Sequence, residues 1–257
     1  IPISVNNTTL NSSSLFKELY TETIVTSLQK EGSFLGLQLP DDTLQKLLEF
    51  DSKNYCYLNR DYNQPFMINL QSNQDVKVKT TCTVGSYLDT HLKCDAFQQI
   101  TNDPVLLEIA QQYLQKPAVY LTSELCWSFP NQSDNSQMIR DAQVFHYDID
   151  DYGAIKFFFY LTDVDESSGA HICILKSHYN KQLWHQIIGQ HCASISDSEL
   201  IESYGAENVT QICGEKGFGF VEDIFCFHKG TMPNQRSRLL LQLEFTTNYY
   251  KKPRAYM

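Results

Sequence analysis

The sequence predicts an α+β protein that is mainly β, with a double-stranded β-helix core of the jelly-roll, cupin-like type and helices packed outside it. Helical periodicity dominates residues 1–115. Strand-like segments then occupy residues 116–248, interrupted by one helical insert at about 179–204. No linker or internal repeat divides the chain, so residues 1–257 are expected to form a single domain.

Four helices are expected in the N-terminal part. Residues 14–30 place apolar side chains at helical spacing, and Gly32 ends that pattern. A second helix is expected after Pro40, where the carboxylate of Asp41 or Asp42 is able to cap it. A third is predicted at about 87–98. A fourth opens at Asn102-Asp103-Pro104 and runs to Leu114.

The second half of the chain contains short runs rich in β-branched and aromatic residues, which are typical of strands. These runs are 118–122, 125–129, 143–149, 154–161, 170–175, 209–213, 218–221, 224–227 and 238–247. Helices packed outside a double-stranded β-helix account for the order of these elements.

Composition indicates a soluble enzyme. The chain is 42% hydrophobic and 12% aromatic, which is enough for one large core. The net charge is −10 with no basic cluster, so nucleic acid is excluded as a partner on electrostatic grounds. No apolar run approaches the roughly 20 residues of a membrane span. Eight scattered cysteines without a C-x-x-C pair predict reduced core thiols, and we expect a cytoplasmic protein that is a monomer or homodimer.

The residues most informative about chemistry are His146-Tyr147-Asp148 and the later His228. Two imidazoles and one carboxylate hold ferrous iron on one face and leave the opposite positions open for a co-substrate and dioxygen. On a strand, His146 and Asp148 point to the same side while Tyr147 points away. A surface salt bridge is the structural alternative for the pair, and His171 and His178 are alternatives to His228.

The sequence around these residues extends the pattern. It comprises Phe145-His146-Tyr147-Asp148, the segment 155–170, Leu175-Lys176-Ser177-His178, and His228-Lys229-Gly230 followed by Arg238-Leu239-Leu240-Leu241-Gln242. Over roughly residues 140–248, the sequence closely resembles the phytanoyl-CoA dioxygenase-like family of Fe(II)/2-oxoglutarate-dependent oxygenases. One departure is Lys176, where the family usually has glycine, and it leaves the local turn open.

The resemblance implies three cofactors or co-substrates: Fe(II), 2-oxoglutarate and dioxygen. His146, Asp148 and His228 are then the catalytic metal ligands. The C5 carboxylate of 2-oxoglutarate needs a fixed cation, and a guanidinium binds a carboxylate through two parallel hydrogen bonds. Arg238 is predicted for this role, with Arg236, which has the same strand parity, as the alternative. Phe158 falls where family members often place an aromatic ring beside the co-substrate.

Five further residues are predicted to bind substrate. Tyr147 and Tyr152 flank the metal strand, while Trp127, Asn131 and Arg140 lie just upstream of it, where relatives often bind substrate. Each has a structural alternative as an ordinary core or loop residue. The substrate is expected to be a small molecule, such as a natural product.

The reaction implied is oxidative decarboxylation of 2-oxoglutarate to succinate and CO2, coupled to hydroxylation of the substrate. Desaturation, cyclisation and epimerisation use the same protein groups. Halogenation is disfavoured, because related halogenases have Gly or Ala where Asp148 stands. Two other classes remain as alternatives: a non-catalytic cupin-like protein that binds a small ligand, and a zinc-dependent hydrolase or isomerase. Arg238 argues against a hydrolase, which needs no buried guanidinium near its metal.

Overall fold

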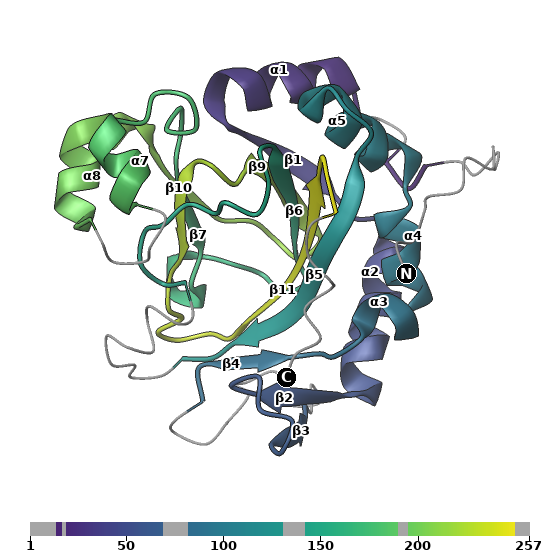
Figure 1. The fold of residues 1–257 in the computed structure, drawn as a ribbon. Helices are drawn as coiled ribbons and strands as arrows, with labels where there is room; N and C mark the ends of the chain where they lie inside the picture. The colour runs from purple at the N-terminus through teal and green to yellow at the C-terminus, as the bar shows by residue number, and fades with distance from the viewer. Residues whose placement is uncertain (1–13, 17–18, 69–81, 131–141, 190–194, 250–257) are drawn as a thin grey trace.

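A computed structural model describes residues 14–16, 19–68, 82–130, 142–189 and 195–249 (Figure 1). The helices are α1 (Thr21–Glu31), α2 (Asp41–Lys53), α3 (Thr90–Lys93), α4 (Asp95–Thr101), α5 (Pro104–Leu114), α7 (Leu183–Ile188) and α8 (Asp197–Tyr204), with 3-10 turns η1 (Glu166–Ser168) and η2 (Ala206–Asn208). The strands are β1 (Ser33–Gln38), β2 (Tyr55–Leu58), β3 (Pro65–Met67), β4 (Val84–Ser86), β5 (Val119–Ser128), β6 (Ala154–Tyr160), β7 (His171–Ile174), β8 (Val209–Ile212), β9 (Phe218–Asp223), β10 (Phe227–Gly230) and β11 (Arg238–Thr246).

The strands form two antiparallel sheets that face each other. The larger sheet has the order β1-β9-β6-β11-β5-β4-β2-β3, and the smaller has the order β10-β7-β8. A β-bridge between His146 and His228 adds the segment that contains His146 and Asp148 to the edge of the smaller sheet. Helices α1 to α5 cover the outer face of the larger sheet, and α7 and α8 lie beyond the smaller one (Figure 1). This is the predicted double-stranded β-helix with helices outside.

Side chains alternate along the central strands, as the period of a strand requires. Phe157 and Phe159 of β6 belong to the large hydrophobic core under the N-terminal helices, together with alternate residues of β11 from Leu239 to Phe245. Their neighbours in sequence point the other way, into the space between the two sheets. This alternation separates a structural face of the larger sheet from a face that lines a cavity.

The predicted helices are present with shifted ends. Helix α1 begins at Thr21 rather than at 14, and Gly32 ends it in the left-handed conformation. The Asp103 side chain caps α5 by accepting from the backbone N–H of Val105 at 2.9 Å. The expected carboxylate cap of α2 is wrong, because Pro40 occupies the cap position. The third predicted helix is two short helices, α3 and α4, separated by Cys94.

The strand predictions need three corrections. The runs 118–122 and 125–129 form one continuous strand, β5. The segment 143–149 makes only a bridge at His146, and the strand predicted at 224–227 is β10, which begins at Phe227. Strands β1 to β4 were not predicted; all precede residue 115 and all join the larger sheet. The sheets therefore include residues well before 116.

Lys176 shows how the chain accommodates its departure from the family pattern. Its backbone has a φ of 66°, in the left-handed region that glycine enters most readily. The turn is held because the Lys176 N–H donates to the carbonyl of Glu31 at 2.7 Å and its Nζ donates to Asn208 Oδ1 at 3.2 Å. A lysine thus occupies the turn without loss of its hydrogen bonds.

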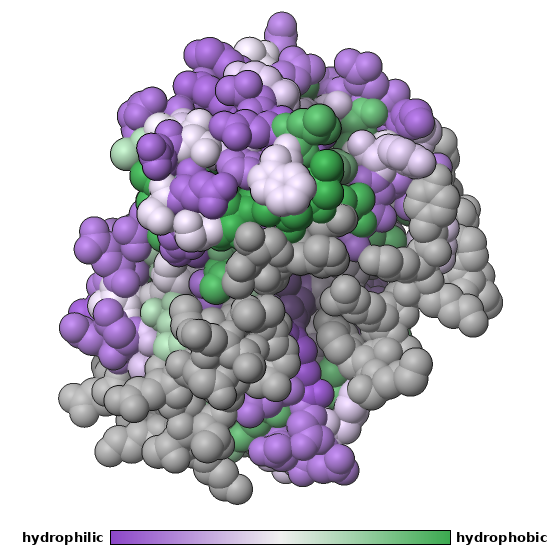
Figure 2. All heavy atoms as spheres, turned by 60° about the vertical axis from the view of Figure 1, so that its left-hand side comes forward, coloured by the Kyte–Doolittle hydropathy of each residue, from purple (hydrophilic) through white to green (hydrophobic). Residues whose placement is uncertain are grey.

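Among the described cysteines, only Cys213 is exposed. None of the described helices is both long enough and apolar enough to cross a membrane. On the side of the molecule that carries α7, apolar residues gather at the surface (Figure 2). Leu183, Trp184 and Ile187 of this helix are exposed there.

Candidate metal centre

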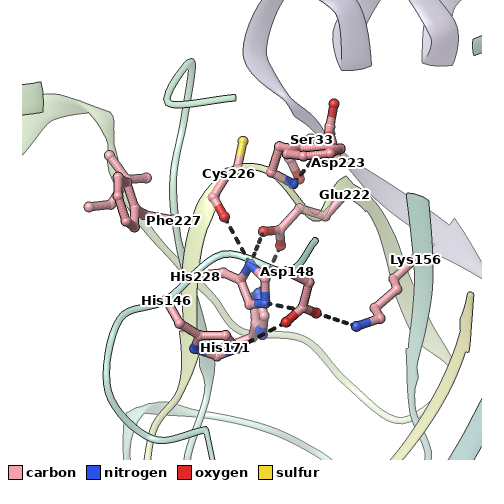
Figure 3. Close-up of polar contacts among 12 residues, drawn as sticks. Ser33, His146, Asp148, Lys156, His171, Glu222, Asp223, Cys226, Phe227 and His228 are labelled. Carbon is pink, nitrogen blue, oxygen red and sulfur yellow. Dashed lines mark hydrogen bonds and ion pairs between the residues drawn. The ribbon is translucent and has the colours of Figure 1, made fainter. Parts of the chain in front are cut away.

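Three side chains from two chain segments converge between the sheets. His146 and His228 are joined by reciprocal backbone hydrogen bonds of 3.1 and 2.9 Å, and their ring centroids lie 4.5 Å apart. The N–H of Asp148 donates to the carbonyl of Ile224 at 2.9 Å, which fixes the carboxylate beside the two rings. One ligand atom from each of His146, Asp148 and His228 lies within 4.8 Å of the others (Figure 3).

The backbone selects which nitrogen each histidine presents. Nδ1 of His146 lies 3.0 Å from the carbonyl of Val144, and Nδ1 of His228 lies 2.9 Å from that of Cys226. A carbonyl only accepts, so each Nδ1 carries the proton and each Nε2 keeps a free lone pair. The Nε2 atoms of His146 and His228 face Asp148 at 3.7 and 3.8 Å. Burial also lowers the pKa of His228 well below its usual range, so this imidazole is neutral, as a metal ligand must be.

A lysine joins this group. Nζ of Lys156, on β6, contacts Oδ2 of Asp148 and lies 3.5 Å from Oε2 of Glu244, on β11. Burial alone would raise the pKa of Asp148, but the Lys156 ammonium together with His228 and His146 outweighs burial and holds that pKa well below its usual range. Asp148 is therefore ionised. Burial raises the pKa of Glu244 to about 7 despite the same ammonium.

The two alternative histidines do not join the ligand group. Nε2 of His171 is hydrogen-bonded to Oε2 of the buried Glu222 at 2.8 Å. Burial lowers the pKa of His171 to about 3 and raises that of Glu222, so the two form an uncharged pair. His178 instead contacts the carbonyl of Gln29 at 3.3 Å. Of the three candidates for the distal ligand, only His228 meets the His146-Tyr147-Asp148 segment.

The three converging residues border a cavity of about 550 Å³ between the sheets. Alternate residues of β5, β6 and β11 supply much of its wall. The described residues that line it are Asn59, Arg60, Val84, Leu121, Thr122, Ser123, Glu124, Cys126, Ser128, Ala142, His146, Asp148, Asp150, Lys156, Phe158, His171, His228, Gly230, Arg238, Leu240, Gln242, Leu243 and Glu244. Most of these side chains are polar or charged, so the cavity suits a ligand with many hydrogen-bonding groups.

Arg238 and Arg236, the two candidates for carboxylate binding, lie in different surroundings. Arg238 is buried at the cavity wall, where Nη1 donates to the carbonyl of Gly169 and Nη2 donates to Ser128 Oγ at 3.2 Å. Its Nε has no hydrogen-bond partner among the described residues. Arg236 has a side chain that is 65% exposed and pairs with Asp165 at 3.3 Å, away from the cavity lining. Of these two arginines, Arg238 is the one placed to meet a ligand inside the cavity.

Phe158 also lines the cavity. Its ring stacks on Phe220 with centroids 4.7 Å apart and lies 5.1 Å from the ring of His171. Two neighbouring rings thus fix its orientation, and it forms an apolar part of the cavity wall.

Of the five residues predicted to bind substrate, the three that the structure describes do not line the cavity. Trp127 points toward the helices, where its Nε1 donates to Asp51 Oδ1 at 2.7 Å. Tyr147 packs on Phe227 beneath the inserted helices, and Tyr152 is 91% exposed. The other two, Asn131 and Arg140, lie outside the described residues.

Sequence reasoning missed several charged residues of the cavity. Lys156 precedes Phe158 by two residues, so strand parity alone would have placed it on the same face. The same rule applied to Arg238 predicts Gln242 and Glu244. No comparable signal marks Glu124, which accepts from Arg60 Nε and Gln242 Nε2, each at 3.0 Å.

Comparisons with known proteins bear on the fold. No family model matches this chain, and no curated protein sequence matches it. Among solved structures, it is similar to the non-heme alpha-ketoglutarate-dependent epimerase SnoN from nogalamycin biosynthesis, with a TM-score of 0.60 and 11% identity over 88% of this chain and 82% of that one. It is also similar to HygX from Streptomyces hygroscopicus, solved with nickel and 2-oxoglutarate bound (TM-score 0.58, 12% identity, 91% and 89% covered). A third is EctD from S. alaskensis with bound Fe (TM-score 0.57, 13% identity, 91% and 80% covered).

Proposed function

We propose that this protein is an Fe(II)/2-oxoglutarate-dependent oxygenase of the phytanoyl-CoA dioxygenase-like type. The observation that carries the proposal is the convergence of His146, Asp148 and His228 on the wall of a cavity that Arg238 also lines. A metal set with open positions and a buried guanidinium for a dicarboxylate are the two requirements of this chemistry. The three similar structures support it, since SnoN is an alpha-ketoglutarate-dependent epimerase, EctD was solved with bound Fe and HygX was solved with nickel and 2-oxoglutarate bound.

The donor set suits ferrous iron. His146 and His228 offer neutral imidazole nitrogens whose tautomers are fixed by backbone carbonyls, and Asp148 offers an ionised carboxylate. With 2-oxoglutarate and dioxygen, bound Fe(II) supplies oxidation of an unactivated C–H bond together with formation of succinate and CO2. Arg238 binds the distal carboxylate of 2-oxoglutarate and fixes its orientation. Phe158 covers an apolar part of the cavity wall and keeps water from the co-substrate.

The substrate is a small polar molecule. Glu124, Gln242 and Glu244 line the cavity along β5 and β11, and Oε1 of Glu244 has no hydrogen-bond partner among the described residues. A long hydrocarbon chain would leave this oxygen of Glu244 desolvated without a partner, which costs about 1–3 kcal/mol. A molecule with hydroxyl or amino groups would instead donate a hydrogen bond to it. Hydroxylation is the proposed outcome for the substrate.

Succinate formation tests the proposal directly. Protein supplied with Fe(II), 2-oxoglutarate and air should form succinate slowly even without its substrate, and His228→Ala should form none above the rate with free iron. A panel of polyhydroxylated and amino-bearing small molecules, followed by mass spectrometry, should then reveal a product that has gained one oxygen. The proposal fails if the wild-type protein binds neither Mn(II), as an inert stand-in for Fe(II), nor 2-oxoglutarate in its presence by calorimetry.

A further inference from the structure

We propose that Lys156 is a positioning residue of the metal centre: its ammonium holds one oxygen of Asp148 so that the other alone is offered to the metal. The inference rests on the proposed function, because it assumes that His146, Asp148 and His228 bind Fe(II). It adds a fourth residue whose task is to set how the carboxylate ligand binds.

The geometry places Lys156 directly behind the ligand. Lys156 lies on β6 in register with Glu244 of β11 on one side and Glu222 of β9 on the other. Its side chain leaves this row and reaches Asp148, with Nζ against Oδ2 (Figure 3). The distance from Nζ to Glu244 is longer, at 3.5 Å. The ammonium therefore engages the metal ligand in preference to the carboxyl of the adjacent strand.

The chemistry of the two groups makes this contact consequential. An ammonium only donates hydrogen bonds, and a carboxylate has two oxygens that are able to bind one metal together or singly. If both oxygens of Asp148 bound the ion, they would fill a coordination position that the co-substrate or dioxygen requires. With Oδ2 held by Lys156, Oδ1 is the oxygen left for the metal. Oδ1 faces His146 Nε2 at 3.7 Å, and Oδ2 lies 3.8 Å from His228 Nε2. The contact with Lys156, rather than the distances to the histidines, therefore distinguishes the two oxygens.

Two roles of Lys156, one through its charge alone and one through orienting Asp148, predict opposite changes in metal affinity when the lysine is removed. A lysine cation beside the site repels a divalent ion, so its removal should tighten metal binding if charge is all that matters. If Lys156 orients Asp148, its removal should weaken binding by roughly 10–100-fold, which is typical for partners that orient metal ligands. The sign of the change in affinity therefore separates the two roles.

The experiment compares Mn(II) affinity by calorimetry in the wild type, Lys156→Met and Lys156→Arg. We expect roughly 10–100-fold weaker binding in Lys156→Met and partial recovery in Lys156→Arg, which keeps the cation. The affinity of the Mn(II)-loaded Lys156→Met protein for 2-oxoglutarate should also fall, because Asp148 becomes free to bind through both oxygens. Equal or tighter Mn(II) binding by Lys156→Met would overturn the inference, whereas failure of the wild type to bind Mn(II) would overturn the proposed function.

Two further variants distinguish a general loss of folding from loss of the contact between Lys156 and Asp148. Lys156→Met leaves Glu244 buried without its cation, so the double variant Lys156→Met/Glu244→Gln removes both charges and should keep a metal-free melting temperature near that of Glu244→Gln alone. Glu244→Gln keeps the contact between Lys156 and Asp148 and should bind Mn(II) about as well as the wild type. Weak binding by the double variant and normal binding by Glu244→Gln support the positioning role. If Glu244→Gln loses as much affinity as the double variant, Lys156 has no specific part.

Discussion

The two faces of β6 and β11 differ as much as two regions of one sheet can. On the face under the helices, every inward residue is apolar, as Phe157, Phe159, Leu241 and Phe245 illustrate. On the face toward the smaller sheet, their neighbours in sequence include Lys156, Arg238, Gln242 and Glu244. A shift of one residue from Phe157 to Lys156 therefore changes the environment from hydrophobic core to a polar part of the cavity. Farther along the two strands, Phe158, Tyr160 and Leu240 form a smaller apolar cluster on the second face.

The difference shows which face stabilises the fold and which serves a ligand. Burial of apolar surface is the main source of stability, while burial of charge costs free energy unless partners offset it. The cavity face retains buried polar atoms that lack hydrogen bonds: Glu244 Oε1 and Arg238 Nε have no hydrogen-bond partner among the described residues. We therefore expect substitutions on the helix face to lower stability, and those on the cavity face to change binding.

The largest expected difference is in stability, between substitutions at two neighbouring residues of β6. Phe159→Ala should lower the free energy of unfolding by about 3–5 kcal/mol, because the ring is fully buried and stacks on Phe16 under the helices. Phe158→Ala should cost less than half as much, since its ring borders a cavity that already exists. Urea denaturation of the metal-free protein measures both. Equal losses would contradict the division of the sheet into two faces.

Substitution of a proposed metal ligand should change metal affinity much more than it changes the free energy of unfolding. His228→Ala should weaken Mn(II) binding by more than about 100-fold, because loss of a ligand exceeds the effect of losing a residue that merely orients one. Its metal-free free energy of unfolding should change by less than that of Phe159→Ala. Calorimetry and urea denaturation on the same preparations give both values. His171→Asn is the matched control at a buried histidine outside the ligand group, and it should keep Mn(II) binding.

The two arginines sharpen the comparison within the proposed co-substrate site. Arg238→Gln should raise the 2-oxoglutarate concentration needed for half-maximal succinate formation by roughly 10–100-fold, since hydrogen bonds to a charged group contribute about 1.5–3 kcal/mol. Mn(II) affinity should stay near the wild-type value. Arg236→Gln should change neither quantity, because that side chain is exposed and pairs with Asp165. A larger effect at Arg236 would move the carboxylate site.

The smallest effect concerns the pH dependence of stability. The pKa of Glu244 is about 7 in the folded protein, against an ordinary value of 4.5. Between these values the unfolded chain binds fewer protons than the folded one, so Glu244 makes stability fall as pH rises from about 4.5 to about 7. Glu244→Gln should remove a slope on the order of 1 kcal/mol per pH unit from the metal-free protein. Urea titrations at several pH values check this, and an unchanged slope would refute the shifted pKa.

Local sequence determined the features that depend on neighbouring residues. The spacing of His146 and Asp148 brought two candidate ligands together, Gly32 ended α1, and Asp103 capped α5, because each effect acts between residues a few positions apart. The apolar run at 154–161 and the run at 238–247 similarly predicted β6 and β11. Strands β2 to β4 have three or four residues each and lie among helical segments, and β1 contains Gly36, which weakens a strand pattern, so all four were missed.

Tertiary structure decided which residues from distant segments meet. Strand parity puts Trp127 and Ser128 on opposite faces of β5, yet parity does not say which face is the cavity, and only the pairing of Ser128 with Arg238 settles it. The contact between Lys156 of β6 and Asp148 likewise requires the segment around His146 to be bridged to β10 in the other sheet. Such contacts depend on how the sheets are paired and stacked, and a single sequence encodes that only through the free energy of the whole fold.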